Sequence, residues 1–538
     1  MNNNAEDVSN QQLIEAQWYR LSPLSICFFV FKFSRQLFKD ALPALVPLFA
    51  VVVSGNSSTS VLSIAGALLV ILIGLFAILQ YWFFKYSIQG ERILVHEGVL
   101  KKYRHNIHCE RIQNINVLQP FYFKFFKLVI LNLDTAGSAA SEISLPGINQ
   151  IRANNIQRIV FNNSQSLRQN IQNHLDDIPS TPHTNNEVHV EITALNEGEN
   201  SQQANPQLSN RQLLVKTRLI HLVQYGLTSN NIFWFFAAIT PLLNSIDDLL
   251  EKYLGKENIN QLVGLLGGGY TGGILLISIT ILGIVFGAIC FSILGAIIKY
   301  YQYELSLNTP TLKRKSGLLT QHEESVNLSK FQAIIRQCNW VGVLLQRQNL
   351  TLKQVSLYSS RKSAAQQLFV VPSLNFLQVD KISHIVFDNF SFSVKLTPVS
   401  RRYILSAWLK LMILPHIILI IVSLRVEASY MLNIIPAIFL GCFLIAYGRW
   451  RKAQYAINDE FIVVQSGLLG FRQIGFPLFK VQHVTIQQSI FQKRHNLASV
   501  FIRLASNKIV IPFIPLKVAQ ECYDRISFQI ETTTKRWF

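Results

Sequence analysis

A basic residue followed two positions later by glutamine recurs three times at a fixed distance from a glycine. Gly98, Gly317 and Gly467 each precede an aliphatic pair, and the basic residue and the glutamine lie thirteen and fifteen residues after the glycine. The three pairs are Arg111 with Gln113, Lys330 with Gln332, and Lys480 with Gln482. Strand residues two apart lie on one face, so each pair is a candidate polar patch. The alternative is structural, because a glutamine at a bulge or strand end satisfies backbone groups.

Three basic clusters are candidate contacts for anionic lipid headgroups. They are Lys101, Lys102 and Arg104; Lys313, Arg314 and Lys315; and Lys493 with Arg494. Close to an anionic leaflet, each such residue contributes about 1 kcal/mol of attraction. The competing interpretation is that these residues only set membrane orientation or lie in solvated loops. In the second copy we expect the cluster to form a basic turn.

The motifs give no indication of catalysis. HExxH, GxSxG and CxxC patterns are absent, and the six cysteines are scattered along the chain. We therefore predict a non-enzymatic protein with no catalytic residue, no metal site and no cofactor. The net charge of +19 is interpreted as basic residues on cytoplasmic faces rather than as a nucleic-acid-binding surface, so no nucleic-acid partner is expected.

The composition indicates an integral membrane protein, because half of the 538 residues are hydrophobic and only 15% are charged. Apolar stretches predict six spans in three hairpins: 38–54 with 60–84, 231–246 with 272–298, and 403–424 with 429–447. Basic residues flank the hairpins on the side away from their short turns. The positive-inside rule then predicts a multi-pass protein with both termini in the cytoplasm.

A segment of about 80 residues follows each hairpin and has the pattern of short strands. Its β-branched and aromatic residues predict a small antiparallel β-barrel or sandwich, and a proline followed by a helical stretch predicts a C-terminal helix. Because the pattern recurs after every hairpin, the chain contains one unit used three times.

The strand segments open with Tyr86, Tyr303 and Tyr455. Together with the glycine-aliphatic turn, the basic-x-Gln strand and the terminal helix, they resemble the bacterial pleckstrin-homology (PH) domain of the second type. Three such domains, each behind a membrane hairpin, resemble the YdbT group of membrane proteins. The resemblance implies PH-like barrels at a bacterial cytoplasmic (inner) membrane. It does not imply a phosphoinositide ligand, because fold is a poor guide to ligand.

The sequence divides into eight segments on this basis. They are a polar N-terminus with an interfacial helix (1–40), hairpin 1 (41–84), barrel 1 (85–161), a disordered Asn/Gln-rich linker (162–210), an interfacial helix with hairpin 2 (211–298), barrel 2 (299–388), hairpin 3 (389–447) and barrel 3 (448–531). The fold class is thus an α+β membrane protein with six transmembrane helices.

The expected function is that of a membrane protein whose three cytoplasmic PH-like domains act as protein-interaction or assembly modules, with envelope homeostasis or stress as the broad role. The expected partners are membrane lipids, a protein of unknown identity and a second copy of the chain. The alternative is a transporter or lipid-handling protein that uses the six spans, although the hairpins are almost wholly apolar and transporters need polar residues at the midplane.

Overall fold

The structure, a computed structural model, describes the chain in separate ranges. These are residues 17–36, 59–89, 92–99, 101–109, 112–135, 142–160, 212–229, 261, 264–265, 269–354, 368–423 and 428–533. The chain clusters into two compact units, Met1–Asn210 with Thr320–Ser325 and Arg211–Leu319 with Val326–Phe538.

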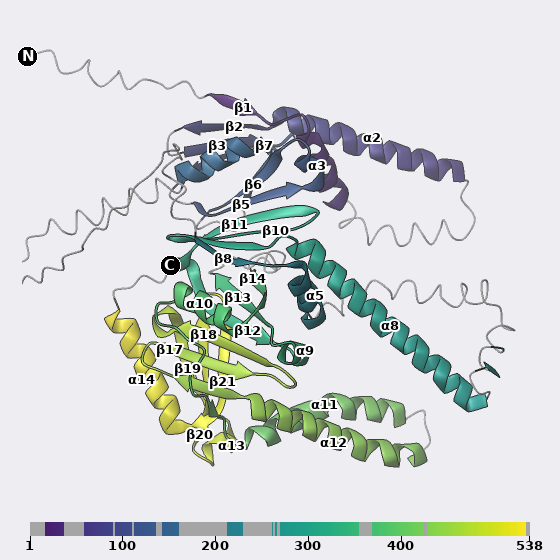
Figure 1. The fold of residues 1–538 in the computed structure, drawn as a ribbon, viewed down its shortest axis with the longest axis vertical. Coiled ribbons are helices and arrows are strands. Elements are labelled where there is room, and N and C mark those ends of the chain that lie inside the picture. Colours follow the sequence, from purple (N-terminus) through teal and green to yellow (C-terminus); the bar gives the residue numbers. More distant parts are fainter. Residues whose placement is uncertain are drawn as a thin grey trace, which may run out of the picture. The chain divides into compact units, whose positions relative to one another are not determined.

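The third copy of the repeat shows the order of elements most completely (Figure 1). In chain order its elements are β15 (Thr397–Pro398), the hairpin helices α11 (Tyr403–Ser423) and α12 (Ala428–Lys452), β16 (Gln454–Ile457), β17 (Phe461–Ser466), β18 (Phe471–Pro477), the 3-10 turn η3 (Leu478–Lys480), β19 (Val481–Gln487), α13 (Ile490–Lys493), β20 (Leu497–Leu504), β21 (Lys508–Pro515) and α14 (Leu516–Thr532). Each copy therefore has seven strand positions, of which β18 is the fourth and β19 the fifth.

The second copy has the same order. Its elements are β8 (Gln212–Lys216), α5 (Leu219–Thr228), α8 (Gly269–Tyr300), β9 (Glu304–Asn308), β10 (Thr311–Ser316), β11 (Thr320–Asn327), η2 (Leu328–Lys330), β12 (Phe331–Cys338), α9 (Trp340–Leu344), β13 (Gln348–Gln354), β14 (Leu368–Leu374) and α10 (Phe376–Val386). A capping box formed by Asn375 and Gln378 fixes the start of α10.

The first copy repeats the order again. It contains β1 (Trp18–Arg20), a helix over 25–36, α2 (Thr59–Phe83), β2 (Lys85–Gln89), β3 (Arg92–Glu97), β4 (Tyr103–His108), β5 (Ile112–Pro120), α3 (Phe121–Lys124), β6 (Leu128–Thr135), β7 (Glu142–Asn149) and a helix over 150–160. The threefold repeat predicted from the sequence is therefore present in the fold.

The first strand of each copy lies before the hairpin in the chain but pairs with the strand that follows the hairpin. Trp18 is opposite Ser87 in the first copy, and Thr397 is opposite Tyr455 in the third. In the second copy, β8 pairs with β9 in the same way. In each copy, the segment predicted as a membrane hairpin thus lies in the chain between two strands that are neighbours in one sheet, an arrangement that the sequence did not indicate.

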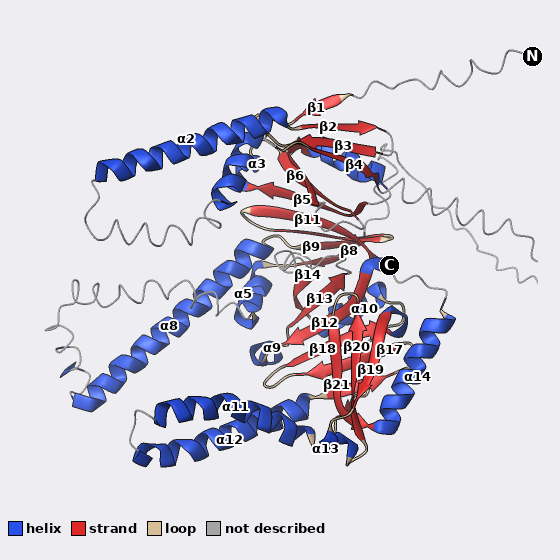
Figure 2. Cartoon of the chain, turned by 180° about the vertical axis from the view of Figure 1, so that it is seen from behind, coloured by secondary structure: helices blue, strands red, loops and turns tan. Residues whose placement is uncertain are grey.

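The strands of each copy are divided between two antiparallel sheets, and each copy has an apolar core. In the first unit, β1-β2-β3-β4 form one antiparallel sheet, and β7-β6-β5 form another in which Thr320–Ser325 of β11 pair with β5. In the second unit, β14-β13-β12-β18-β17-β16-β15 form one seven-stranded sheet, and β19-β20-β21 form a three-stranded sheet (Figure 2). The first four strands of each copy thus belong to one sheet and its last three to another.

The cores of the second and third copies interlock at the seven-stranded sheet. Ala456 and Val463 of the third copy lie in the apolar core of the second, and Ala333 of the second lies in the core of the third. A Cβ on Gly475 would stand 2.1 Å from Cζ of Phe390, so glycine leaves the space that this ring fills. The two copies therefore share apolar packing as well as backbone hydrogen bonds.

Four of the six predicted spans appear as helices, namely α2, α8, α11 and α12. Among the described residues, one helix, Ile281–Tyr300, is both long and apolar enough to cross a membrane, and Ala67–Phe83 and Tyr403–Ile417 are shorter apolar helices. The structure thus supports one span, and six are not supported. The predicted spans 38–54 and 231–246 and the linker 162–210 lie outside the described residues.

Candidate functional site

The glycine-aliphatic turn connects the third and fourth strands beside the end of the hairpin. Gly98 and Gly317 have φ angles of 102° and 120°, which side-chain-bearing residues rarely adopt. In the second copy, the amides of Gly317 and Leu318 donate to the carbonyls of Tyr301 and Ile298, so the turn is tied to the end of α8. Gly467 is crowded instead, since a Cβ there would lie 2.3 Å from the carbonyl oxygen of Gly470.

In the second and third copies, the basic-x-Gln pairs do not lie together on a strand face. Lys330 and Lys480 each end a 3-10 turn, one residue before the fifth strand begins. Gln113, Gln332 and Gln482 each fall where the pairing of the fifth strand shifts register, which is the position of a β-bulge. Gln332 is buried and Gln482 is exposed, while Arg111 and the side chain of Gln113 lie outside the described residues.

Lys480 is the most deeply buried of the candidate cations, with 4% of its surface exposed. Its Nζ donates to the carbonyl oxygen of Ser329 in the second copy at 2.7 Å. Burial lowers the pKa of Lys480 to about 8, because the charged ammonium loses hydration. This lysine therefore links two copies of the repeat, and it is too enclosed to contact a lipid headgroup.

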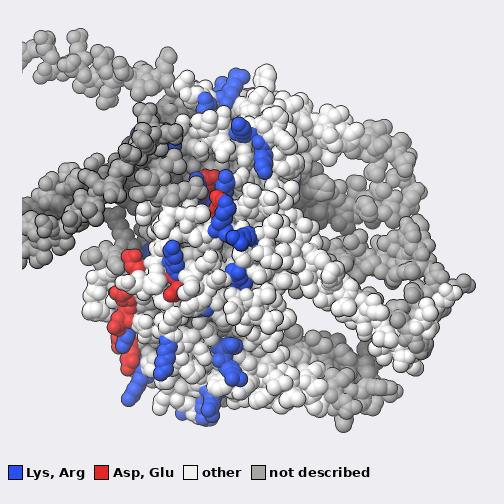
Figure 3. Space-filling view, viewed as in Figure 1, with Lys and Arg blue, Asp and Glu red and all other residues white. Residues whose placement is uncertain are grey.

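The other basic clusters have different settings. Lys101, Lys102 and Arg104 are exposed in and before β4, and Lys493 and Arg494 are exposed at the end of α13. Lys313, Arg314 and Lys315 lie within strand β10, so the predicted basic turn was wrong. The Arg314 guanidinium lies 4.8 Å from the ring centroid of Phe369 and donates to the carbonyl of Leu368. In the space-filling view, basic side chains lie in separate small groups (Figure 3).

The junction between the second and third copies is the most constrained polar site. In it β12 pairs with β18, and Ile334 is opposite Gly475. Arg336 is 7% exposed, and its Nε donates to Oε1 of Gln348 at 2.6 Å while its Nη1 donates to Oε1 of Gln473 at 3.1 Å. Burial lowers the pKa of Arg336, and Phe471, 5.1 Å from the guanidinium carbon, provides an aromatic face.

A second junction with the same register lies in the first unit, between β5 and β11. There Ile115 is opposite Ser325. Ile115 and Ile334 each lie seventeen residues after the glycine of their own repeat, and Ser325 and Gly475 each lie eight residues after theirs. The fifth strand of one copy thus pairs with the fourth strand of the next copy in one fixed register.

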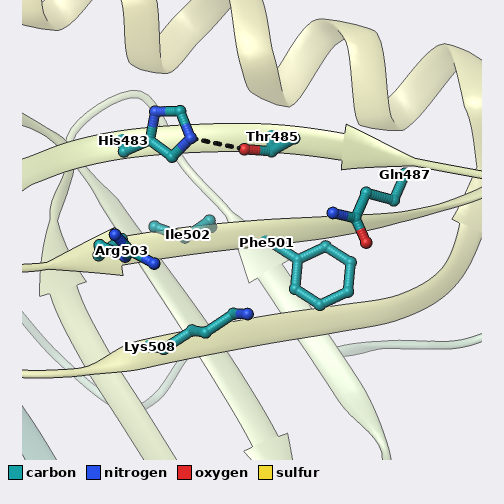
Figure 4. Close-up of a pocket in the computed structure, with 7 residues that line it drawn as sticks. All are labelled: His483, Thr485, Gln487, Phe501, Ile502, Arg503 and Lys508. Carbon is teal, nitrogen blue, oxygen red and sulfur yellow. Dashed lines mark hydrogen bonds between the residues drawn. The ribbon is translucent and has the colours of Figure 1, made fainter.

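The fifth strand of the third copy, β19, ends the three-stranded sheet. Its alternate residues His483, Thr485 and Gln487 point over the same face as Phe501 and Arg503 of β20 and Lys508 of β21 (Figure 4). They line a shallow hollow of about 190 Å³, in which Thr485 Oγ1 and His483 Nε2 share a hydrogen bond of 2.8 Å. The hollow offers hydrogen-bonding groups beside a strand edge.

The parts of the chain that the structure describes contain no group of three or more His, Cys, Asp or Glu residues able to hold a metal ion. None of the described cysteines forms a disulfide. Four of them are buried, namely Cys109, Cys338, Cys442 and Cys522.

Comparison with known proteins identifies the repeated unit. The family model described as "Bacterial PH domain" matches residues 41–164 and 406–529, which include the second to seventh strands of the first and third copies. Two segments of the chain therefore match the bacterial PH-domain family. Both matched ranges also include residues of the apolar hairpins, so the family model covers hairpin helices together with the strands.

Two relatives extend the comparison. The UPF0699 transmembrane protein YdbT of Bacillus subtilis (strain 168) is 22% identical over 493 residues, which is 91% of this chain and 93% of that protein. The UPF0699 transmembrane protein YdbS of the same organism is 32% identical over 85 residues, 16% of this chain and 54% of that protein. No solved structure gives a significant match. The resemblance to the YdbT group is confirmed, and both relatives are named as transmembrane proteins.

Sequence reasoning missed the junctions and the short helices that follow the fifth strands. A signal for the helices was present, because the residue twenty-three positions after each repeat glycine is Phe121, Trp340 or Ile490, all exposed. The sequence also contained a signal for Arg336. It is a charged residue at a position that the apolar Val117 and Ile486 occupy in the other copies.

Proposed function

We propose that this protein is a non-enzymatic, multi-pass protein of the bacterial inner membrane whose three PH-like domains act as protein-interaction or assembly modules at the cytoplasmic membrane surface. The proposal includes a multi-pass topology with both termini in the cytoplasm. The observation that carries the assembly role is the register shared by the β5–β11 and β12–β18 junctions. Strand addition at a sheet edge is a general mode of protein recognition.

One fourth-position strand and one fifth-position strand lie at the ends of their sheets. Among the strands that the structure describes, β4 is a fourth-position strand that ends its sheet, and β19 is a fifth-position strand that ends its sheet. These are the two strand types that pair at each junction within the chain. A second copy of the chain can therefore supply β4 to β19, which extends the junction from one molecule to the next and gives a head-to-tail assembly.

The shared register specifies the intermolecular pairs. Val484 would lie opposite Asn106, Thr485 opposite His105, and Ile486 opposite Arg104. Residues Val481–Gln487 include no lysine, arginine or acidic residue, so no pair places two such charges opposite each other. Lys101, Lys102 and Arg104 near the β4 edge disfavour indiscriminate pairing with other strands, which is a common protection of exposed edges.

Cysteine cross-linking in membranes tests this assembly. One tagged chain carries Val484→Cys, a differently tagged chain carries Asn106→Cys, and both carry Cys27→Ser and Cys290→Ser, which remove the described cysteines that are exposed. Mild oxidation should give a disulfide-linked heterodimer. The matched control replaces Asn106→Cys with His108→Cys, which is two residues out of register on the same strand and should cross-link much less.

Two outcomes would contradict the proposal in its homotypic form. One is equal cross-linking by the in-register and out-of-register pairs, which would indicate random collision. The other is no cross-linking from either pair while the protein remains folded, which would mean that β19 does not receive β4 of a second copy.

A further inference from the structure

The short helix after the fifth strand carries exposed apolar residues in every copy. The exposed fraction is 61% for Trp340 and 79% for Leu344 in α9, and 79% for Ile490 in α13. In the first copy Phe125, directly after α3, is 89% exposed. Isolated exposed apolar residues are ordinary, but a cluster at the same position of three repeats marks an interaction surface.

Hydrogen bonds through the end of α5 hold α9 at a defined position along α8, the helix that is long and apolar enough to span a membrane. The side chain of Asn339, at the start of α9, donates to the carbonyl oxygen of Thr228 at 2.6 Å. The next residue, Ser229, shares a hydrogen bond of 2.8 Å with Ser292 of α8. Ser292 also donates to the carbonyl of Gly226 at 2.7 Å, so the end of α5 is fixed to the middle of Ile281–Tyr300.

Ser292, the point of attachment, lies within the span Ile281–Tyr300. Ser292 precedes Tyr300, the last residue of the span, by eight residues, which corresponds to about 12 Å along an α-helix. A 20-residue apolar helix is about as long as the hydrocarbon core of a bilayer is thick, roughly 30 Å. If Tyr300 lies at one boundary of the core, the start of α9 lies beneath that boundary rather than in water.

Apolar side chains surround α9 on one side. Gly342 and Val343 line a groove of about 460 Å³ with Phe376, Leu377 and Phe471, and its polar lining residues are Gln346, Gln348 and Asn375. The side chain of Leu377 is 79% exposed at its rim. In the third copy, exposed Lys493 and Arg494 follow the apolar residues of α13, and such long cationic side chains reach the headgroup level while their stems remain in apolar surroundings.

We propose that α9 inserts into the leaflet next to the PH-like domains, with Trp340, Leu344 and Leu377 in contact with lipid acyl chains. α3 and α13 present equivalent surfaces in the first and third copies. The occupant is the lipid bilayer itself, since the attachment to α8 places this surface alongside the span. Insertion would fix the orientation of the domain relative to the membrane independently of any protein partner.

Lipid quenching of an environment-sensitive fluorophore tests the proposal on the full chain in nanodiscs of zwitterionic phosphatidylcholine. The fluorophore is attached at Leu344→Cys in the Cys27→Ser, Cys290→Ser background. The control site is Asn308→Cys, the exposed last residue of β9 in the same copy. The label at residue 344 should show blue-shifted emission and lose intensity when nitroxide-bearing lipids are included. The label at residue 308 should respond to aqueous iodide instead.

Iodide quenching of the label at residue 344 without lipid quenching would overturn the proposal. Blue-shifted emission without lipid quenching would also overturn it, because protein rather than lipid would then cover α9. Leu377→Cys provides a second label on the same surface if the variant at residue 344 does not fold, and it carries the same expectations.

Discussion

Replacing Arg336 should loosen the junction between the second and third copies. Arg336→Met removes the hydrogen bonds to Gln348 and Gln473 but retains an unbranched apolar side chain. A hydrogen bond to a charged group contributes about 1.5–3 kcal/mol, although part is offset because the buried guanidinium no longer has to be desolvated. The bond to Gln473 should therefore appear as a coupling energy of about 1.5–3 kcal/mol between the two residues.

Amide hydrogen exchange of the detergent-solubilised chain measures this coupling locally, which avoids assuming two-state unfolding of a multidomain protein. Since about 1.4 kcal/mol corresponds to a tenfold change in an equilibrium constant, the coupling corresponds to roughly a ten- to hundredfold effect on the exchange of β18 peptides. The double-mutant cycle pairs Arg336→Met with Gln473→Ala. Arg525→Met is the matched control, because the ion pair of Arg525 with Asp459 is exposed. The effect of Arg525→Met should be additive with that of Gln473→Ala.

Additive effects of Arg336→Met and Gln473→Ala on β18 exchange would show that Arg336 does not couple the two copies. The same conclusion would follow if Arg336→Met accelerated exchange in β13, which carries Gln348, but left β18 unchanged. In either case the guanidinium would stabilise only its own copy.

Three further perturbations probe the same fold. The pKa of Lys480 is about 8 in the folded chain and 10.5 in the reference state, so the unfolded chain binds the proton more tightly between these values. Between pH 8 and 10.5, the free energy of unfolding should therefore rise by up to about 3 kcal/mol more in the unsubstituted chain than in Lys480→Met. Thermal unfolding of both proteins measures this difference. Gly317→Ala should cost about 1–3 kcal/mol because φ is 120°, and exchange in β10 should accelerate. In Gly226→Ala the new Cβ meets Ile293 at 2.6 Å, so exchange in α5 should accelerate through an overpacking cost of about 1–3 kcal/mol.

The sequence was sufficient for features that depend on periodicity. Alternating apolar residues predicted the strands, and the repeat predicted that one order of elements would occur three times. The first strands were missed because they are two to five residues long and lie before the hairpins, as β15 (Thr397–Pro398) illustrates. No local pattern links Thr397 to Tyr455, fifty-eight residues later, although the two are paired.

The junctions could not be predicted for a related reason. Tertiary packing decides which strand edges pair with each other. The strands of a closed barrel and those of a shared sheet have the same alternation of apolar and polar residues. Lys330 and Lys480 were misplaced because a 3-10 turn precedes the fifth strand, so the basic residue lies before the strand rather than on it. The polar character of Arg336 in a buried strand was the residue-level clue that a partner strand covers it.

If the strand junction found twice within the chain also operates between molecules, amide exchange of β19 should depend on protein concentration. We expect β19 peptides to become more protected as the concentration rises, together with β4 peptides, while the internal fifth strands β5 and β12 do not change. Exchange of β19 that is independent of concentration, in a sample that still associates, would mean that the molecules meet through another surface.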